Sequence, residues 1–473
     1  MKLRHYQESA VDRCRKAFRN GKQRVIVQAP TGAGKTVIAK AIIDGALARG
    51  NRVVWFSHSE TLGNQAIDTF TCDVVRLFAS DKTPDKYDVL VTMVYTLKNR
   101  MSDIPAPNVV IIDEAHHAAA QSYEDIMEQW PDAKVIGFTA TPERLDGKPL
   151  KAFQEIIDMP SPRWFIEQGY LAEYEYLAPP MTSEDLAALS QVSKMSGDYS
   201  KKGLQEFVEE RPSITGNAVQ HYLSHALNTQ ALVFCVGVKA AKQTADSFWA
   251  EGIPAAYLSG DMKREQREEI IEKFKAGRIK VLTSCQLIGE GFNVPAVQTV
   301  ILMRPTKSLT VFLQQVGRAL RPKEDSSRAI ILDMVNNVKE HGLPCVDRTW
   351  SLTGKVKRPK PEQLIRVCSS CLQVFANQQY LTCPSPYPEH PCALVTQLKK
   401  ERELEKQEGE LIRINEWRDM HPEWANNRNL EHLPLAEAKR LARGDWAKLH
   451  QIAKAKGYKP GIVHHWAKEK VRH

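Results

Sequence analysis

Residues 24–36 read RVIVQAPTGAGKT, and this stretch decides the fold. Its first part, Arg24–Gln28, is a short β-branched run that predicts a buried strand. A glycine-containing loop follows, and the next stretch, Thr36–Arg49, has the pattern of a helix. Such a strand–loop–helix unit cradles phosphate, because backbone N–H groups and the helix N-terminus both point at the anion.

The polar residues of this loop match the chemistry of a bound nucleotide. Lys35 would reach the β- and γ-phosphates, and the Thr36 hydroxyl would ligate Mg²⁺. The strict pattern begins with Gly where this chain has Ala29. The alternative is an ordinary glycine turn before a helix, but Gly-x-Gly-Lys-Thr directly after a strand favours the phosphate loop. The residues expected to surround the phosphates are Thr31, Gly32, Ala33, Gly34, Lys35 and Thr36.

The alternation of strands and helices continues in two separate stretches. The first set of strands is expected at Arg24–Gln28, Val53–Ser57, Val89–Thr92, Val109–Ile112 and Val135–Thr139. The second set is expected at Ala231–Cys235, Ala255–Leu258, Val281–Ser284, Thr299–Met303 and Ala329–Leu332. Near-continuous apolar strands separated by helices are typical of parallel sheets. The predicted fold class is therefore α/β, with two tandem parallel-sheet domains and a cleft between them.

The chain of 473 residues is too long for one hydrophobic core. Changes in composition divide it into a nucleotide-binding domain, a more polar connecting segment, a second α/β domain, a basic Pro-broken linker, a cysteine cluster and a basic helical region. Their expected ranges are, in that order, 1–160, 161–228, 229–345, 346–366, 367–395 and 396–473.

An acidic pair ends another predicted strand. Asp113 and Glu114 directly follow Val109–Ile112, and ligands of open α/β sheets bind at the carboxyl ends of their strands. Asp113 suits a contact to Mg²⁺, and Glu114 suits polarisation of an attacking water. A solvated turn is the alternative, but the phosphate loop upstream favours the catalytic interpretation.

The second α/β unit carries cations suited to the same site. Arg318 and Arg321 stand three residues apart, which on a helix is one face. Phosphoryl transfer needs cations that meet the charge developing on the γ-phosphate. Two arginines arriving from the second unit would complete the site only when the cleft closes, so hydrolysis would be coupled to domain motion. The alternative is a surface arginine pair on an amphipathic helix.

Four of the nine cysteines fall within 25 residues: Cys368, Cys371, Cys383 and Cys392. The Cys-x₂-Cys spacing of the first two suits one tetrahedral metal, and the other two would complete a structural Zn²⁺ site. A second Cys-x₂-Cys pair is absent, so His390 is a rival fourth ligand. The segment is short and Pro-rich, and bound metal would stabilise its fold directly.

The basic charge of the chain is concentrated in its last quarter. The net charge is +9 overall, +1 over residues 1–345 and +8 over residues 346–473. A basic appendage on a neutral body suggests a polyanionic partner, and a solvated helical tail is the alternative. Four tryptophans among these cations would stack on nucleic-acid bases or form the core of a small helical unit: Trp417, Trp424, Trp446 and Trp466.

Composition excludes several classes of protein. Hydrophobic residues make up 42% of the chain and charged residues 26%, which excludes wholesale disorder. No stretch approaches the roughly 18 apolar residues that cross a bilayer. Residues 1–7 lack the apolar core of a secretory signal, so a cytoplasmic location is expected.

Together these residues resemble the superfamily 2 helicases, the DEAD/DEAH-like group, over roughly residues 1–345. The resemblance implies two RecA-like domains that bind ATP·Mg²⁺ in their cleft and a nucleic-acid strand across their tops. Residues 31–36 resemble motif I and residues 113–116 motif II. Motif VI is matched by Gln314, Gly317, Arg318 and Arg321.

The resemblance also implies roles for residues between these motifs. Arg4 and Gln7 belong to a stretch that looks like the adenine-reading motif. Contacts to nucleic acid, or coupling of hydrolysis to strand movement, are implied for Ser57, His58, Thr92, Thr139, Thr141 and Thr283. Nucleotide contacts are implied for Gly289, Gly291 and Asn293, although Asp is usual in the family where this chain has Asn293.

Several stretches look like the RadD-type DNA repair helicases and their phage relatives. They are residues 137–147, 289–295, 341–344 and 456–461, together with the cysteine cluster. This resemblance implies single-stranded, forked or branched DNA as the partner, with RNA as the weaker alternative. The favoured function is a DNA helicase of repair, recombination or phage replication. The alternatives are a double-strand translocase that does not separate strands and an ATP-gated nucleic-acid-binding adaptor with negligible turnover.

Overall fold

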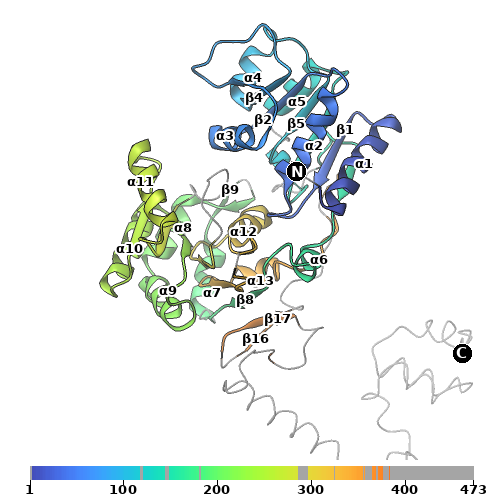
Figure 1. Cartoon of the computed structure of the whole chain (residues 1–473). Helices are drawn as coiled ribbons and strands as arrows, with labels where there is room; N and C mark the ends of the chain where they lie inside the picture. The colour runs from blue at the N-terminus through green and yellow to red at the C-terminus, as the bar shows by residue number, and fades with distance from the viewer. Residues whose placement is uncertain are drawn as a thin grey trace, which may run out of the picture. The chain divides into compact units, whose positions relative to one another are not determined.

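A computed structural model describes residues 3–117, 121–143, 149–179, 183–195, 197–285, 297–323, 325–354, 356, 365–368, 371–376 and 383 (Figure 1). The chain divides into two compact units, residues 1–393 and residues 394–473, and all described residues belong to the first. The predicted helical region 396–473, its four tryptophans and residues 456–461 therefore lie outside the described residues.

A seven-stranded parallel sheet and its helices form the first lobe. The strand order is β3-β4-β2-β5-β6-β1-β7. The strands are β1 (Arg24–Gln28), β2 (Val53–Ser57), β3 (Val74–Leu77), β4 (Val89–Met93), β5 (Val109–Ile112), β6 (Lys134–Thr139) and β7 (Glu155–Asp158). The helices are α1 (His5–Arg19), α2 (Lys35–Leu47), α3 (Glu60–Thr69), α4 (Val94–Arg100), the short η1 (Ala115–His117) and α5 (Gln121–Gln129).

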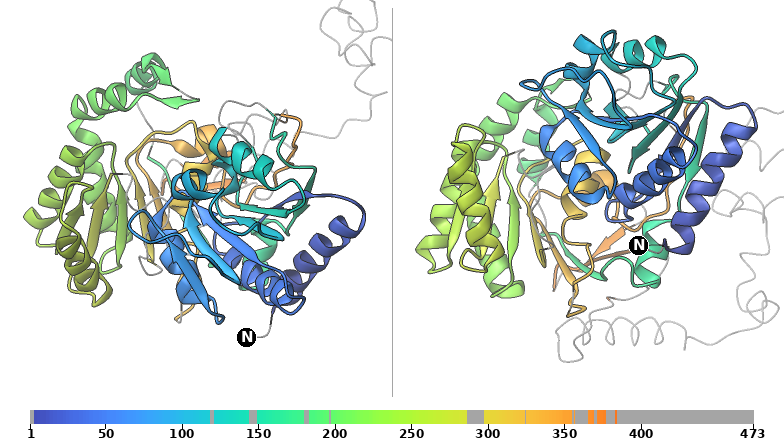
Figure 2. Two further views of the ribbon diagram at one scale, coloured as in Figure 1. Left: turned by 90° about the horizontal axis from the view of Figure 1, so that it is seen from above. Right: turned by 45° about the horizontal axis from the view of Figure 1, so that its top comes forward.

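A six-stranded parallel sheet in the order β12-β13-β11-β14-β15-β8 forms the second lobe, and helices cover its faces (Figure 2). Its strands are β8 (Tyr174–Leu177), β11 (Ala231–Phe234), β12 (Ala255–Leu258), β13 (Val281–Ser284), β14 (Thr299–Leu302) and β15 (Ala329–Asp333). Its helices are α7 (Ser183–Gln191), α8 (Lys201–Glu209), α9 (Pro212–His225), α10 (Val238–Ala250), α11 (Arg264–Lys275), α12 (Leu309–Val316) and α13 (Asn337–His341). A small antiparallel hairpin joins β9 (Lys194–Met195) to β10 (Asp198–Tyr199).

Both faces of the first sheet are buried. In β1, Val25 and Val27 belong to one hydrophobic cluster, whereas Ile26 between them belongs to another. Successive side chains of a strand point to opposite faces, so the uninterrupted apolar run fills two cores at once. This dual burial is why the alternation of apolar strands and helices predicts a parallel sheet.

The predicted fold class is confirmed, and all ten predicted strands are present. The sequence analysis did not predict β3, β7 and β8. Strand β8 lies within residues 161–228, which we expected to be a connecting segment, and it pairs with β15 at the edge of the second sheet. Helix α6 (Pro162–Glu167) of the same segment packs on the first lobe instead, because its Phe165 ring lies 4.8 Å from the ring of Tyr6.

A segment after α13 returns from the second lobe to the first. The backbone N–H of Leu150 donates to the carbonyl of Leu352 (2.9 Å), and the Leu352 side chain packs against the first lobe's core. Arg348 holds the segment in shape by donating to four backbone carbonyls, those of His341, Leu343, Pro344 and Val346. The lobes are therefore joined by two stretches of chain.

The start of the cysteine region docks on strand β8. Strands β16 (Ile365–Val367) and β17 (Val374–Ala376) form an antiparallel pair. The N–H of Ala178 donates to the carbonyl of Leu372 (3.1 Å), and Leu177 forms a β-bridge with Gln373. The missed strand β8 thus gives this region its attachment to the second lobe.

Replacing Tyr176 with Phe tests how strongly β8 is fixed to its sheet. The buried Tyr176 hydroxyl donates to the Asp333 carboxylate (2.8 Å), and burial raises the pKa of both groups. Without that donor the carboxylate loses a buried hydrogen bond, so the free energy of unfolding in urea should fall by about 1–3 kcal/mol. The control Tyr95→Phe, at a side chain that is 70% exposed, should change it by less than about 0.5 kcal/mol. Equal stability of the Tyr176→Phe variant and the parent would contradict the argument.

Candidate functional site: a phosphate loop closed by the second lobe

The loop between β1 and α2 has the geometry of an anion cradle. Gly32 and Gly34 adopt positive φ angles of 90° and 82°, a region that side-chain-bearing residues rarely take. Gly34 is the N-cap of α2, so Lys35 and Thr36 open that helix, and the N-terminus of a helix attracts anions. The six loop residues predicted from the sequence therefore surround one helix N-terminus.

The acidic pair lies beside this loop. The Lys35 ammonium contacts the Glu114 carboxylate (Nζ–Oε1 2.7 Å). Glu114 has a φ of 47°, and such a backbone conformation costs energy in a residue with a side chain. Burial raises the pKa of Asp113 to about 6, an effect that the cation of Lys35 opposes and the charge of Glu114 reinforces. The Asp113 carboxylate and the Thr36 hydroxyl, which opens α2 after the phosphate loop, are oxygen donors of the kind that Mg²⁺ prefers.

The N-terminal motif packs on the same loop. Tyr6 and Gln7 both point hydrogen-bond donors at the carbonyl of Ala33, at 3.4 and 3.5 Å. Gln7 also accepts from the backbone N–H of Arg4 (3.0 Å), which fixes its amide. The Arg4 guanidinium lies over the ring of Tyr170 (4.3 Å to the centroid). Gln7 thus lies beside the phosphate loop and Arg4 next to Gln7, while their role in reading the base stays a prediction.

The second lobe contacts the phosphate loop directly. A Cβ built on Gly317, at the end of α12, would lie 2.6 Å from Cγ2 of Thr31 and 2.8 Å from the carbonyl oxygen of Leu313. No side chain fits in that space, so glycine is required for this approach. Gln314 and Arg318 flank Gly317 and are buried, and burial lowers the pKa of Arg321.

The sequence analysis was wrong about the helix that carries the arginines. We expected Arg318 and Arg321 on one helical face, but α12 ends at Val316, and Arg318 donates its backbone N–H to the carbonyl three residues back (3.2 Å). Pro322 explains why no regular helix reaches Arg321, because proline disfavours helical geometry in the residue before it. Both arginines therefore lie in the turn that follows α12.

A chain of side-chain contacts joins the acidic pair to the second lobe. His116 Nδ1 lies 3.2 Å from Thr139 Oγ1, and Thr139 Oγ1 accepts from the N–H of Thr141 (3.1 Å). The Thr141 hydroxyl in turn bonds the hydroxyl of Thr310 on α12 (2.6 Å). We call His116, Thr139, Thr141 and Thr310 the relay. Sequence reasoning identified Thr139 and Thr141 but missed Thr310, because a threonine early in an amphipathic helix carries no local signal of a contact across lobes.

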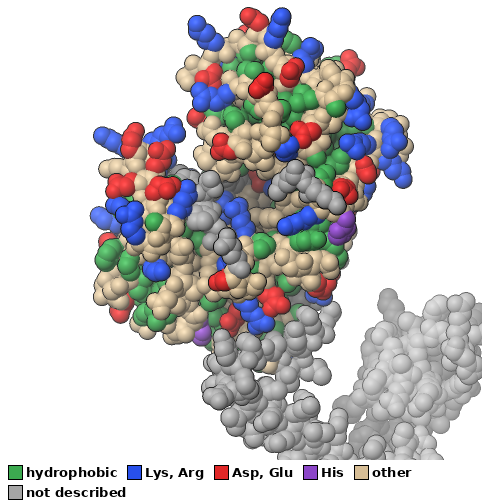
Figure 3. All heavy atoms as spheres, viewed as in Figure 1, with side chains coloured by type: hydrophobic (Ala, Val, Ile, Leu, Met, Phe, Trp, Pro, Cys, Tyr) green, Lys and Arg blue, Asp and Glu red, His purple; other side chains and the backbone are tan. Residues whose placement is uncertain are grey.

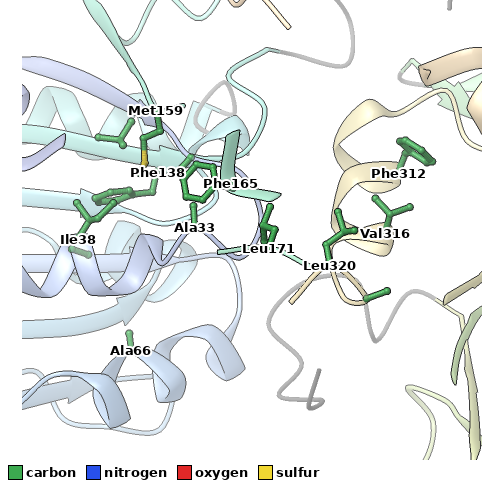
Figure 4. Packing of buried hydrophobic residues seen from close by; sticks show 14 of the residues in the cluster. Ala33, Ile38, Ala66, Phe138, Met159, Phe165, Leu171, Phe312, Val316 and Leu320 are labelled. Atoms are coloured by element: carbon green, nitrogen blue, oxygen red, sulfur yellow. The ribbon is translucent and has the colours of Figure 1, made fainter. Parts of the chain in front are cut away.

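The residues between α6 and β8 lie between the two lobes. Figure 4 shows Leu171 between Ala33 of the phosphate loop and Leu320 after α12. A Cβ on Gly32 would lie 2.9 Å from Leu171, and the N–H of Ala172 donates to the carbonyl of Leu320 (2.8 Å). A cavity of about 440 Å³ adjoins this point, lined from both lobes by residues such as Thr31, Leu171 and Gly317. The segment thus seals one side of the interlobe contact.

Most residues implied to touch nucleic acid lie at the carboxyl ends of strands. Ser57, Thr92 and Thr283 are fully buried, and their hydroxyls bond backbone carbonyls, those of Thr92 and Thr283 at 2.7 and 2.6 Å. His58 follows β2, and its ring lies 4.8 Å from that of His117. Gly289, Gly291 and Asn293 lie outside the described residues, as do residues 144–148.

Three of the four predicted zinc ligands come together. The Sγ atoms of Cys368, Cys371 and Cys383 lie within 4.8 Å of one another, and those of Cys371 and Cys383 are 3.6 Å apart. Tetrahedral zinc with Zn–S bonds of about 2.3 Å needs sulfur–sulfur distances of about 3.8 Å. The described triad fits that geometry, while Cys392 and His390 lie outside the described residues.

Comparisons with known proteins agree with this geometry. The family described as "Type III restriction enzyme, res subunit" matches residues 1–144, and "Helicase conserved C-terminal domain" matches residues 215–323. A 51.5 kDa protein of a Lactococcus phage is 32% identical, over 75% of this chain and 76% of its own length. The chain belongs to the superfamily 2 ATP-dependent helicases and translocases.

More distant relatives of this superfamily 2 enzyme are also similar. The putative ATP-dependent helicase IRC3 of Saccharomyces cerevisiae is 30% identical over 70% of this chain, which spans 51% of IRC3. The DNA 3'-5' translocase XPB2 of Sulfurisphaera tokodaii is 25% identical over 71% of this chain and 82% of its own length. A fragment of a putative HsdR subunit of a type I restriction enzyme from Vibrio vulnificus shares the fold, with a TM-score of 0.56 at 21% identity over 72% of this chain and 66% of the fragment. Among the described residues, no helix has the length and apolar character to span a membrane.

Replacing Thr310 with Val tests the relay. The change keeps the shape of the side chain and removes the Thr141–Thr310 hydrogen bond, which is worth about 1 kcal/mol, so nucleic-acid-stimulated ATP hydrolysis should fall about fivefold. Basal hydrolysis should change much less, because Thr310 does not touch the phosphate loop in any described contact.

Two matched variants serve as controls. Thr310→Ser retains the hydroxyl and should keep the stimulation. Thr299→Val breaks a threonine pair within the second lobe (Thr229–Thr299, 2.7 Å) and should leave it unchanged. Steady-state ATPase rates with and without single-stranded DNA measure the stimulation in each variant. Stimulation of Thr310→Val equal to that of the parent would refute the role of the relay.

Proposed function

We propose that this enzyme couples ATP hydrolysis to movement along DNA and separates DNA strands. The observation that carries the proposal is the packing of Gly317 against Thr31, which brings the motif VI turn of one lobe onto the phosphate loop of the other. A nucleotide held at that junction contacts both lobes. Its cleavage and release therefore change the preferred arrangement of the lobes.

In this proposal the first lobe binds the nucleotide. Arg4 and Gln7 hold the base, residues 31–36 hold the phosphates, and Thr36 and Asp113 ligate Mg²⁺. Mg²⁺ would supply charge neutralisation at the phosphates. Glu114 polarises the attacking water, and its strained backbone and contact with Lys35 hold its carboxylate at the phosphate loop.

The second lobe supplies the remaining charge. Arg318 and Arg321 stabilise the charge that develops on the γ-phosphate, and Gln314 belongs to the same catalytic set. Burial of Arg321 lowers its pKa by disfavouring the cation, and an adjacent anion would offset this cost. Nucleotide contacts of Gly289, Gly291 and Asn293 belong to the same proposal.

DNA is favoured as the partner by what similar proteins bind. XPB2 is described as a DNA translocase, and a solved restriction-modification enzyme with a TM-score of 0.52 is described as bound to DNA. One similar protein comes from a phage, which favours a role in phage replication or recombination, whereas a repair role of the RadD type rests on the sequence resemblance alone. Charges of both signs are mixed on the face shown in Figure 3, in keeping with the near-neutral charge of residues 1–345. The basic excess after residue 345 would therefore add DNA affinity.

The main competing function is a translocase that does not separate strands. ATPase rates on single-stranded, duplex and forked DNA and on matched RNA, measured beside unwinding of the fork, distinguish these functions. We expect single-stranded and forked DNA to stimulate hydrolysis most. Stimulation by duplex alone would favour the double-strand translocase, and stimulation by RNA alone would overturn the choice of DNA.

Substitutions in the two lobes should separate binding from catalysis. Lys35→Ala should abolish hydrolysis and weaken ATP binding. Arg321→Ala should bind ATP but hydrolyse it about 10³-fold more slowly, since catalytic arginines contribute 10³–10⁵-fold. Fluorescent nucleotide binding and single-turnover hydrolysis measure the two effects. A Lys35→Ala variant that behaves like the parent would favour the ATP-gated adaptor.

We further propose that Cys368, Cys371 and Cys383 hold a structural Zn²⁺ with Cys392 or His390 as fourth ligand. Purified protein should contain about one zinc per chain, and Cys371→Ser should lower that content and loosen residues 365–376 from β8. Cys72→Ser, at a partly exposed cysteine far from the triad in sequence, is the control. Metal analysis and hydrogen exchange provide the measurements, and well-folded protein without zinc would refute the site.

A further inference from the structure

A short hairpin on the second lobe has no role in the nucleotide site. Strands β9 and β10 pair Met195 with Asp198 and Lys194 with Tyr199, and Gly197 in the turn has a φ of 89°. At the base of the hairpin, the hydroxyls of Ser193 and Ser200 lie 2.7 Å apart, and the N–H of Ser200 donates to the carbonyl of Ser193 (2.8 Å). A hairpin this small is marginal alone, so its shape depends on what anchors it.

One carboxylate anchors the hairpin to the loop before α12. Asp198 Oδ1 accepts from the N–H of Lys307 (2.6 Å), and Oδ2 accepts from the hydroxyl of Thr306 (2.9 Å) and lies 3.4 Å from the guanidinium of Arg304. Tyr199 beside it is buried. The hairpin is therefore rigidly attached to residues 304–307, and these lead into the helix that carries Thr310 and contacts the phosphate loop.

This anchor places the hairpin at the carboxyl-terminal edge of the second sheet. Residues 304–307 follow the end of β14. Helix α8, which follows the hairpin, covers the end of β11, because a Cβ on Gly237 would lie 2.6 Å from the Gln205 amide. The residues that the resemblance implies to contact nucleic acid or to couple hydrolysis to strand movement, such as Thr283, lie at this end of the strands.

An apolar side chain is exposed next to the turn of the hairpin, and lysines are exposed near its base. The Met195 side chain is 66% exposed, although methionine is commonly buried. Lys194 on β9 and Lys201 and Lys202 at the start of α8 are exposed as well, and Lys202 Nζ lies 3.9 Å from the Glu206 carboxylate. An exposed apolar tip on a rigid support, flanked by ammonium groups, matches what wedge residues need: a side chain to enter a base stack and charges to hold the phosphates.

We propose that the β9–β10 hairpin is a strand-separating wedge, with Met195 pressed against the terminal base pair of duplex DNA at a fork. The proposal rests on the proposed function, because the wedge works only if the enzyme moves along DNA. Each change in lobe arrangement moves α12, and the Asp198 anchor carries the hairpin with it. The base pair is then opened mechanically, while the lysines contact the separated backbones.

The test separates the wedge from the motor. Met195→Ser removes the apolar tip and, at an exposed site, leaves the fold intact. Three rates are measured on full-length protein: ATP hydrolysis with single-stranded DNA, displacement of streptavidin from either end of a single strand, and unwinding of a forked duplex. Leu227→Ser is the matched control. Leu227 is 52% exposed and precedes β11, so it lies at the amino-terminal end of the strands, away from the hairpin.

We expect Met195→Ser to unwind the fork about tenfold more slowly, with the other two rates changed less than about twofold. Met195→Leu should restore unwinding, and Leu227→Ser should match the parent throughout. Unwinding by Met195→Ser at the parental rate would overturn the wedge, as would a parent that displaces streptavidin but opens no fork. A parent whose ATP hydrolysis does not respond to DNA would instead overturn the proposed function itself.

Discussion

The architecture depends on the close approach of Gly317 to Thr31. A turn of the second lobe reaches the phosphate loop of the first at a distance that excludes even one methyl group. Packed contacts of this kind have discrete arrangements rather than a continuous range. In the proposed function, the nucleotide in the loop therefore selects between an engaged and a disengaged second lobe. Binding energy at the phosphates would in this way be converted into a difference in lobe arrangement.

A second contact between the lobes is polar and therefore depends on orientation as well as on distance. The relay joins His116 beside the acidic pair to Thr310 on α12 through three hydrogen-bonding steps. A hydroxyl pair of 2.6 Å is sensitive to displacements that an apolar contact tolerates. A small displacement of the acidic pair would therefore be transmitted to α12, the helix whose C-cap is Gly317. The steric contact and the hydrogen-bonded relay both end on α12. This helix therefore carries both of these contacts to the first lobe.

The sequence predicts the interior of each sheet better than its edges and its contacts across lobes. Most of the ten predicted strands are apolar, β-branched runs with little exposure, and this burial is what their composition encodes. Strand β8 reads Tyr174-Glu175-Tyr176-Leu177 and takes its stability from partners distant in sequence, such as Asp333. The phosphate-loop residues were predictable because their chemistry is local. Thr310 was not, since its partner lies 169 residues away, and the end of α12 was missed although Pro322 stands nearby.

The attachments of the second lobe explain why its edges matter for function. Strand β8 holds the cysteine region at one edge of the sheet, and the Asp198 anchor holds the β9–β10 hairpin on its carboxyl-terminal side. Both attachments belong to the lobe that contains α12, whereas Leu352 fastens the returning segment to the first lobe. In the proposed function, movement of the second lobe would carry the hairpin and the cysteine region together, because both are attached to it. The proposed work on DNA would then be done at the periphery of one lobe, while the nucleotide at the junction of the two lobes controls it.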